Sequence, residues 1–127
     1  MKTGKILATA AFLGLIAVVL GAFGAHGLKK LVTPEQVESF KTGVTYQMYH
    51  ALALLAVGLA KIPASKQKKI FIFMLTGVLL FSGSIYLLTF KNFIPFNISF
   101  IGPITPLGGV AMIVGWGLFA LSFKDYR

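Results

Sequence analysis

The sequence predicts an all-α integral membrane protein: one domain over residues 1–127, built as a bundle of four membrane-spanning helices. Four stretches contain no Lys, Arg, Asp or Glu, and they are 23, 19, 21 and 32 residues long. Crossing a hydrocarbon core of about 30 Å takes roughly 20 mainly apolar residues in a helix. The composition, 57% hydrophobic and 12% charged, also lies outside the range of soluble domains. The four stretches are Ile6–Leu28, Thr42–Ala60, Ile70–Phe90 and Asn92–Phe123.

The first span is predicted at Ile6–Ala25, and small residues recur along it at steps of three or four. Such a small-residue face lets two helix backbones approach closely in lipid, where packing drives association. The last span carries a similar face. The positions expected to serve helix packing are Gly14, Ala17, Gly21, Ala25, Gly108, Ala111 and Gly115.

The second span is preceded by a helix-start signal at Thr33-Pro34-Glu35-Gln36. Thr33 suits the N-cap, Pro suits the first helical position, and Gln36 can complete a capping box. We expect a short amphipathic helix at Pro34–Thr42, near the outer membrane interface, that continues into the second span and ends around Ile62.

The third span is predicted at Ile70–Thr89, after a short polar hairpin at Pro63–Lys69. The connection Phe90–Ile104 contains Asn, Pro and Gly, which interrupt helices, yet it is apolar for a loop. Thr105-Pro106 has the residue types of an N-cap followed by a first helical position, so the fourth span is expected to begin there.

The net charge of +9 follows the topology of the predicted spans. The termini and the second connection together carry eight Lys and Arg residues, whereas the first and third connections carry four. Cytoplasmic loops are enriched in Lys and Arg, so both termini are expected in the cytoplasm of a bacterial cell, with the chain multi-pass in the inner membrane. The lipid bilayer is the expected partner, and the absence of a basic face argues against nucleic acid.

Signals of enzymes and cofactors are absent from the sequence. There is no cysteine, and neither a nucleophile elbow, a zinc-protease motif, a P-loop nor a pair of carboxylates occurs. The uncharged stretches contain no Asp or Glu, which disfavours a proton-coupled transporter. The chain is expected to be non-enzymatic, and no cofactor is expected.

Polar residues at membrane depth are expensive, and each needs a reason. In the predicted topology they gather in the outer half of the bundle, while the cytoplasmic half has almost none. The candidate ligand-binding residues are His26, Tyr46, Gln47, Tyr49, His50, Ser82, Ser84, Tyr86 and Thr105.

Three interpretations of this polar group stay open. The residues can hydrogen-bond one another and hold the helices together. They can instead form a site for a small ligand, such as a quinone-like molecule or a solute. A third possibility is that His26 and His50 ligate haem or a metal ion, which requires the two imidazoles to face each other across the bundle.

The chain resembles a domain-of-unknown-function family of small bacterial inner-membrane proteins, which is also similar to a small eukaryotic transmembrane protein. The segments that carry the resemblance are Gly21–His26, Tyr46–Ala53, Phe81–Tyr86, Thr105–Gly109 and Gly115-Trp116. The resemblance implies a four-span membrane protein, and it implies no catalytic residues. We expect a non-enzymatic structural or accessory protein that packs as a homo-oligomer or against a membrane-protein partner.

Overall fold

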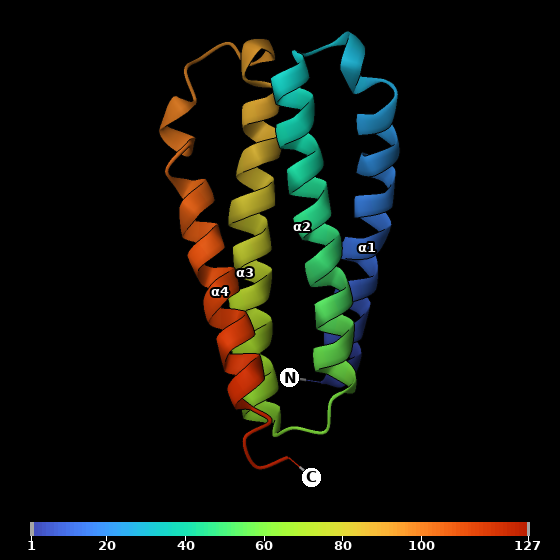
Figure 1. The fold of residues 1–127 in the computed structure, drawn as a ribbon, viewed down its shortest axis with the longest axis vertical. Coiled ribbons are helices and arrows are strands. Elements are labelled where there is room, and N and C mark those ends of the chain that lie inside the picture. The colour runs from blue at the N-terminus through green and yellow to red at the C-terminus, as the bar shows by residue number, and fades with distance from the viewer. Residues whose placement is uncertain (1, 127) are drawn as a thin grey trace.

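The computed structural model describes residues 2–126, and four long helices account for most of them (Figure 1). They are α1 (Thr3–Ala25), α2 (Pro34–Leu59), α3 (Ala64–Thr89) and α4 (Ile104–Leu121). Successive helices run in opposite directions, so both ends of the chain lie at the same end of the bundle. Each helix packs chiefly against its neighbour in sequence, with α1 and α4 at opposite edges. The prediction of an all-α bundle is confirmed.

Three helical segments are long and apolar enough to cross a membrane: α1, α3 and the segment Ser99–Leu121, which contains α4. The fourth helix, α2, has 26 residues and therefore a length of about 39 Å at 1.5 Å per residue. It is more polar than the other three, and its charged residues Glu35, Glu38 and Lys41 are exposed. Two of its polar side chains, Gln47 and His50, are buried against the neighbouring helices.

The helix-start signal before α2 is confirmed. The Thr33 hydroxyl accepts a hydrogen bond from the backbone N–H of Gln36 (3.2 Å), and the Gln36 side chain accepts one from the Thr33 N–H (3.0 Å). The helix then continues without a break through the amphipathic turns into the second span, as the sequence predicts, and it ends at Leu59, three residues before the predicted end near Ile62.

The start of α3 differs from the prediction, because the helix begins at Ala64 rather than at Ile70. The extra turns contain Lys and Gln, which are good helix formers. Gln67 also has a tertiary reason to be helical: its side chain is buried and its amide donates to the carbonyl oxygens of Val57 (3.0 Å) and Ala60 (3.3 Å). These are carbonyls at the end of α2, so Gln67 satisfies acceptors that a helix terminus leaves free.

The start of α4 also differs, because Pro103 takes the N-cap position and Thr105 lies inside the helix. Thr105 therefore is not the N-cap residue that the sequence suggests. Its hydroxyl instead forms a hydrogen bond with the Ser84 hydroxyl of α3. An interhelical partner has replaced the local one. The connection before it contains two short 3₁₀ helices, η2 (Lys91–Phe93) and η3 (Ser99–Ile101).

The small residues of α1 face α2. Ala17 is buried, and a Cβ atom added to Gly14 would lie 3.8 Å from the Ala51 Cβ. A Cβ added to Gly21 would lie 3.5 Å from a methyl carbon of Val44. Ala25, by contrast, is exposed. In its place Gly24 is buried, and a Cβ there would lie 3.1 Å from the Phe40 ring.

The small residues of α4 face α3 at much closer range. A Cβ added to Gly108 would lie 2.3 Å from the backbone nitrogen of Phe81, and one added to Gly77 would lie 2.8 Å from the backbone nitrogen of Met112. Gly115 is also buried, and a Cβ there would lie 2.7 Å from the side chain of Met74. The buried stripe of α4 therefore passes through Met112.

Ala111, which the sequence analysis placed on this stripe, is only partly buried. It is adjacent to Met112, whose side chain is 4% exposed. Met112 is too large to look like a contact residue in a small-residue pattern, yet its neighbour on α3 is Gly77, which leaves room for it.

Candidate functional site

Gln47 is the centre of the polar residues inside the bundle. Its side-chain nitrogen donates to the carbonyl oxygen of Leu13 in α1 (2.8 Å), and its side-chain oxygen accepts from the Tyr86 hydroxyl of α3 (2.7 Å). One buried amide on α2 thus connects three helices. A primary amide suits this position because it offers both donors and an acceptor.

Two serines of α3 extend the network, one to α2 and the other to α4. The Ser82 hydroxyl donates to the carbonyl oxygen of Gly43 in α2 (2.7 Å), and Ser84 shares its hydrogen bond with Thr105 of α4. Both serines are buried. Within residues 2–126, every buried side-chain nitrogen or oxygen has a hydrogen-bond partner. The arrangement is a satisfied network, in which no buried polar atom is left free to receive a ligand.

His50 is paired with Trp116 of α4. The Trp116 Nε1–H donates to His50 Nε2 (3.0 Å), and His50 Nδ1 lies 2.7 Å from the carbonyl oxygen of Tyr46, to which its N–H donates. Because an indole nitrogen can only donate, the Trp116 contact requires Nε2 to be the acceptor, so the imidazole is neutral with its proton on Nδ1. Both ring nitrogens are therefore engaged.

His50 lies near the middle of the uncharged part of α2. It is nine residues from Lys41 and eleven from Lys61, or about 14 Å and 16 Å along a helix. Gln47 and Tyr86 lie closer to the end of the bundle that holds the α1–α2 connection. The polar group therefore extends from that half of the bundle to its centre.

His26 does not join this group, contrary to the prediction that both histidines converge. It is exposed and follows the last residue of α1, whereas the network meets α1 at Leu13. Thirteen residues of helix separate these levels by about 20 Å. The two imidazoles therefore cannot ligate one metal ion or haem. The described residues also contain no group of three or more His, Cys, Asp or Glu side chains that could hold a metal ion.

Tyr46 and Tyr49 lie on the exposed face of α2, and their side chains do not join the network. Tyr46 is 39% exposed, and its ring packs on Phe81 of α3 with the centroids 5.0 Å apart. Tyr49 is 57% exposed and touches Tyr46 at a centroid distance of 5.8 Å. Neither hydroxyl takes part in the side-chain hydrogen bonds of residues 2–126, in contrast to the Tyr86 hydroxyl.

A cleft of about 320 Å³ opens beside His50, between α2 and α4 and above α3. Its residues are mostly aromatic or apolar: Tyr46, His50, Phe81, Gly109, Met112, Ile113 and Trp116. Trp116 is not among the polar residues predicted from the sequence. The available signal was its indole N–H at mid-membrane depth, which needs an acceptor on a neighbouring helix.

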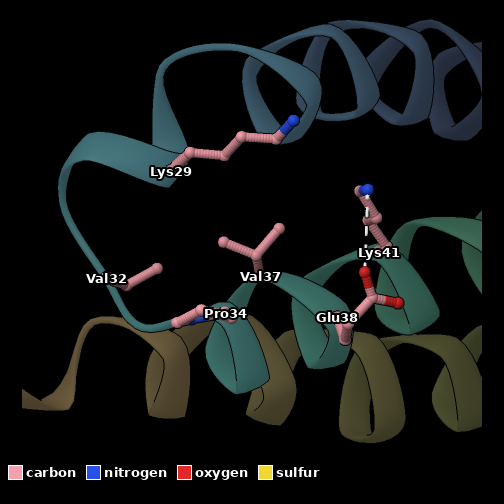
Figure 2. Close-up of a pocket in the computed structure, with 6 residues that line it drawn as sticks. All are labelled: Lys29, Val32, Pro34, Val37, Glu38 and Lys41. Atoms are coloured by element: carbon pink, nitrogen blue, oxygen red, sulfur yellow. Dashed lines mark ion pairs between the residues drawn. The ribbon is translucent and has the colours of Figure 1, made fainter.

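Two of the cavities at the ends of the bundle contain pairs of lysines. One, of about 340 Å³, is formed where η1 (Leu28–Lys30) and the following loop pass over the start of α2. Figure 2 shows Lys29 extending over this cavity and Lys41 paired with Glu38, at an N–O distance of 3.8 Å. The other, of about 190 Å³, lies between the start of α3 and the end of α4. Both are lined by lysines above apolar side chains.

Comparison with known proteins identifies a family. Residues 20–109 match the family described as "Protein of unknown function (DUF423)". The chain is 41% identical over 115 residues to the UPF0382 membrane protein YwdK of Bacillus subtilis, covering 88% of the chain and 89% of that protein. It is 42% identical over 111 residues to a UPF0382 membrane protein of Schizosaccharomyces pombe, covering 84% and 91%.

A third relative is the UPF0382 inner membrane protein YgdD of Escherichia coli, 37% identical over 129 residues, with 96% of the chain and 91% of the relative covered. The similarity therefore runs through nearly the whole chain. No solved structure matches it.

Proposed function

The chain belongs to the DUF423 family of membrane proteins, and we propose that it is a non-enzymatic accessory protein that associates in the bilayer with a second copy or with another membrane protein. We further propose that it crosses the inner membrane of a bacterium four times, with both termini in the cytoplasm. The excess of Lys and Arg at the end of the bundle that holds the termini supports this orientation. The E. coli relative is named an inner membrane protein, which supports the compartment.

The observation that carries the proposal of association is the exposed face of α2. Thr45 and Tyr49 lie there, with Tyr49 eight residues from Lys41 and therefore about 12 Å inside the uncharged stretch. In hydrocarbon, a hydroxyl group without a hydrogen-bond partner is costly. A protein surface that supplies an acceptor for the Tyr49 hydroxyl removes this cost, which lipid chains cannot do.

Glycines on the outside of the helices support the same proposal. A Cβ atom added to Gly4, Gly83 or Gly117 would meet nothing within 4 Å, so these glycines are not needed for contacts within the chain. The buried glycines of α1 and α4, in contrast, already serve contacts with α2 and α3. A partner helix therefore has small-residue positions available only on the outer faces.

Disulfide crosslinking of single-cysteine variants tests the proposal cleanly, because the natural chain contains no cysteine. Thr45→Cys places the thiol on the exposed face of α2, and Val18→Cys places it on α1, where residue 18 is 62% exposed. Oxidation in native membranes is expected to trap Thr45→Cys in a homodimer, or in a larger product with a partner that has a cysteine at the contact, and to leave Val18→Cys monomeric.

The mass of the crosslinked product distinguishes a second copy from another protein. Equal crosslinking of the two variants would indicate random collision in the membrane. If Thr45→Cys stays monomeric under oxidation and the chain also migrates as a monomer after mild extraction, association through this face is excluded.

The cleft beside His50 favours a second candidate function: binding of a membrane-soluble ring compound with a carbonyl or hydroxyl group, such as a quinone. Tyr46 supplies a hydroxyl at the rim, and Phe81 and Trp116 supply ring surfaces. Binding sites of this kind are usually apolar with a few polar groups that fix orientation. The cleft does not include Gln47 or its partners Leu13 and Tyr86. A ligand can therefore bind in the cleft without breaking the hydrogen bonds of Gln47.

Trp116 is the sole tryptophan, so its fluorescence reports directly on the cleft. Titration with a short-chain benzoquinone should give saturable quenching in the natural chain. His50→Ala should remove the saturable component, whereas Leu15→Ala, at an exposed position of α1, should retain it. Quenching that rises linearly without saturation in the natural chain would exclude a quinone site.

A further inference from the structure

The cavity between the start of α3 and the end of α4 combines two lysines with an apolar floor. It has a volume of about 190 Å³ and is lined by Lys66, Lys69, Ile70, Leu118, Leu121 and Ser122. It lies at the end of the bundle that holds both termini. The cavity therefore sits at the boundary between the charged connections and the uncharged spans.

Within residues 2–126, the two lysines of this cavity are not paired with a carboxylate. Lys66 and Lys69 are three residues apart on α3, so they project from neighbouring positions of one helix face. Like charges at this spacing repel each other. The ion pair present within residues 2–126 joins Lys41 to Glu38, at the opposite end of the bundle. No carboxylate of the described chain pairs with either lysine of the cavity.

The floor of the cavity is continuous with the surface that faces lipid. Ile70 is 1% exposed and closes the cavity from the core side, whereas Leu121 is 67% exposed on the outside of α4. A molecule that places a negative group between the lysines can thus extend an apolar chain along α4. A soluble anion can bind to the lysines, but it has no apolar group that would cover the leucines.

We propose that this cavity binds an anionic phospholipid, with the phosphate group held by Lys66 and Lys69 and an acyl chain lying against Leu118 and Leu121. Basic pockets between membrane helices on the cytoplasmic side are suited to anionic head groups, because the lysines supply charge and the bilayer supplies the ligand at high local concentration. The cavity at the other end is less suited, because Glu38 already neutralises Lys41 there.

The test compares two double variants that remove the same charge from the same end of the molecule. Lys66→Gln/Lys69→Gln removes both cavity lysines, and Lys61→Gln/Lys68→Gln removes two exposed lysines of the same region that do not line the cavity. Each protein is extracted in mild detergent, and binding of phosphatidylglycerol and of phosphatidylcholine is measured by native mass spectrometry. The thermal midpoint of each protein checks that the fold is retained.

We expect the natural chain to retain phosphatidylglycerol in preference to phosphatidylcholine. The cavity variant should bind phosphatidylglycerol about tenfold or more weakly, and the matched variant should stay within about twofold of the natural chain. Equal losses in the two variants would show a diffuse charge effect and overturn the proposal. So would equal binding of the two lipids by the natural chain.

A third arm uses inorganic phosphate at millimolar concentration. Failure of phosphate to displace phosphatidylglycerol supports a site that also needs the acyl chain. Full displacement would mean that the lysines bind a soluble anion, and the proposal of a lipid site would be wrong. If the thermal midpoint of the cavity variant falls well below that of the natural chain, Leu121→Gln replaces it in the comparison. This substitution changes only an exposed residue of the cavity floor. Undiminished lipid binding by Leu121→Gln would overturn the proposal.

Discussion

The α1–α2 and α3–α4 contacts both run along small residues, but the atoms that lie opposite those residues differ between the two contacts. Between α3 and α4, a Cβ on Gly108 would lie 2.3 Å from a backbone nitrogen of α3. Between α1 and α2, a Cβ on Gly14 or Gly21 would lie 3.8 Å or 3.5 Å from side-chain carbons of α2. The first contact is backbone against backbone, and the second is backbone against side chain.

The difference shows that one sequence pattern can serve two physical purposes. Glycine at a backbone contact cannot be replaced, because any side chain would push the two helices apart. Glycine opposite the end of a side chain only provides room, and a methyl group can often share that room. A hydrogen bond accompanies each contact: Gln47 of α2 donates to Leu13 of α1, and Ser84 of α3 bonds to Thr105 of α4.

The largest effect is expected at Gly108. Gly108→Ala places a methyl group against the backbone of α3, so the helices must separate, and we expect a loss of about 3 kcal/mol or more in the free energy of unfolding. The measurement is the midpoint of thermal or detergent-induced unfolding of the purified protein. Gly117→Ala is the matched control on the same helix, because a Cβ there meets nothing within 4 Å. Similar midpoints for the two variants would contradict a backbone contact between α3 and α4.

A smaller effect is expected at Gln47. Gln47→Leu keeps a similar volume but leaves the Tyr86 hydroxyl without its acceptor, at a cost of about 1–3 kcal/mol. Tyr86→Phe leaves the Gln47 side-chain oxygen without its donor but keeps the Gln47 bond to Leu13, so its cost should lie at the lower end of that range, about 1 kcal/mol. Unfolding of both single variants and of the double variant measures the coupling. Strict additivity would mean that the two side chains do not interact.

The smallest effect is expected at Gly14. Gly14→Ala brings the new methyl group to an ordinary contact distance from Ala51, and alanine is favoured over glycine inside a helix by about 0.5–1 kcal/mol. The variant should therefore be as stable as the natural chain or slightly more so. The larger change Gly21→Leu should destabilise the fold itself, because Val44 of α2 occupies the space beside residue 21. A strong loss of stability in Gly14→Ala would show that α1 and α2 pack as closely as α3 and α4.

The amino-acid sequence by itself determined the membrane class, the number of helices and most of their ends. The length of an uncharged stretch indicates whether a helix can span lipid. The capping box before α2 depends on two residues that are three positions apart. These are local properties, so they can be recognised without knowledge of neighbours. Where a distant partner intervened, local signals failed: Gln67 extended α3 to reach the end of α2, and Thr105 bonded to Ser84 rather than capping α4.

Only the tertiary structure decided which helix each face meets and at what depth. The spacing of Tyr46 and His50 places them on one side of α2, but it does not say that Trp116 of α4 completes the His50 contact. Nor does it say that His26 lies about 20 Å along α1 from Leu13, the residue of α1 that Gln47 contacts. Helix rotation and pairing depend on the sum of many small packing terms between segments distant in sequence, and no single residue carries that information.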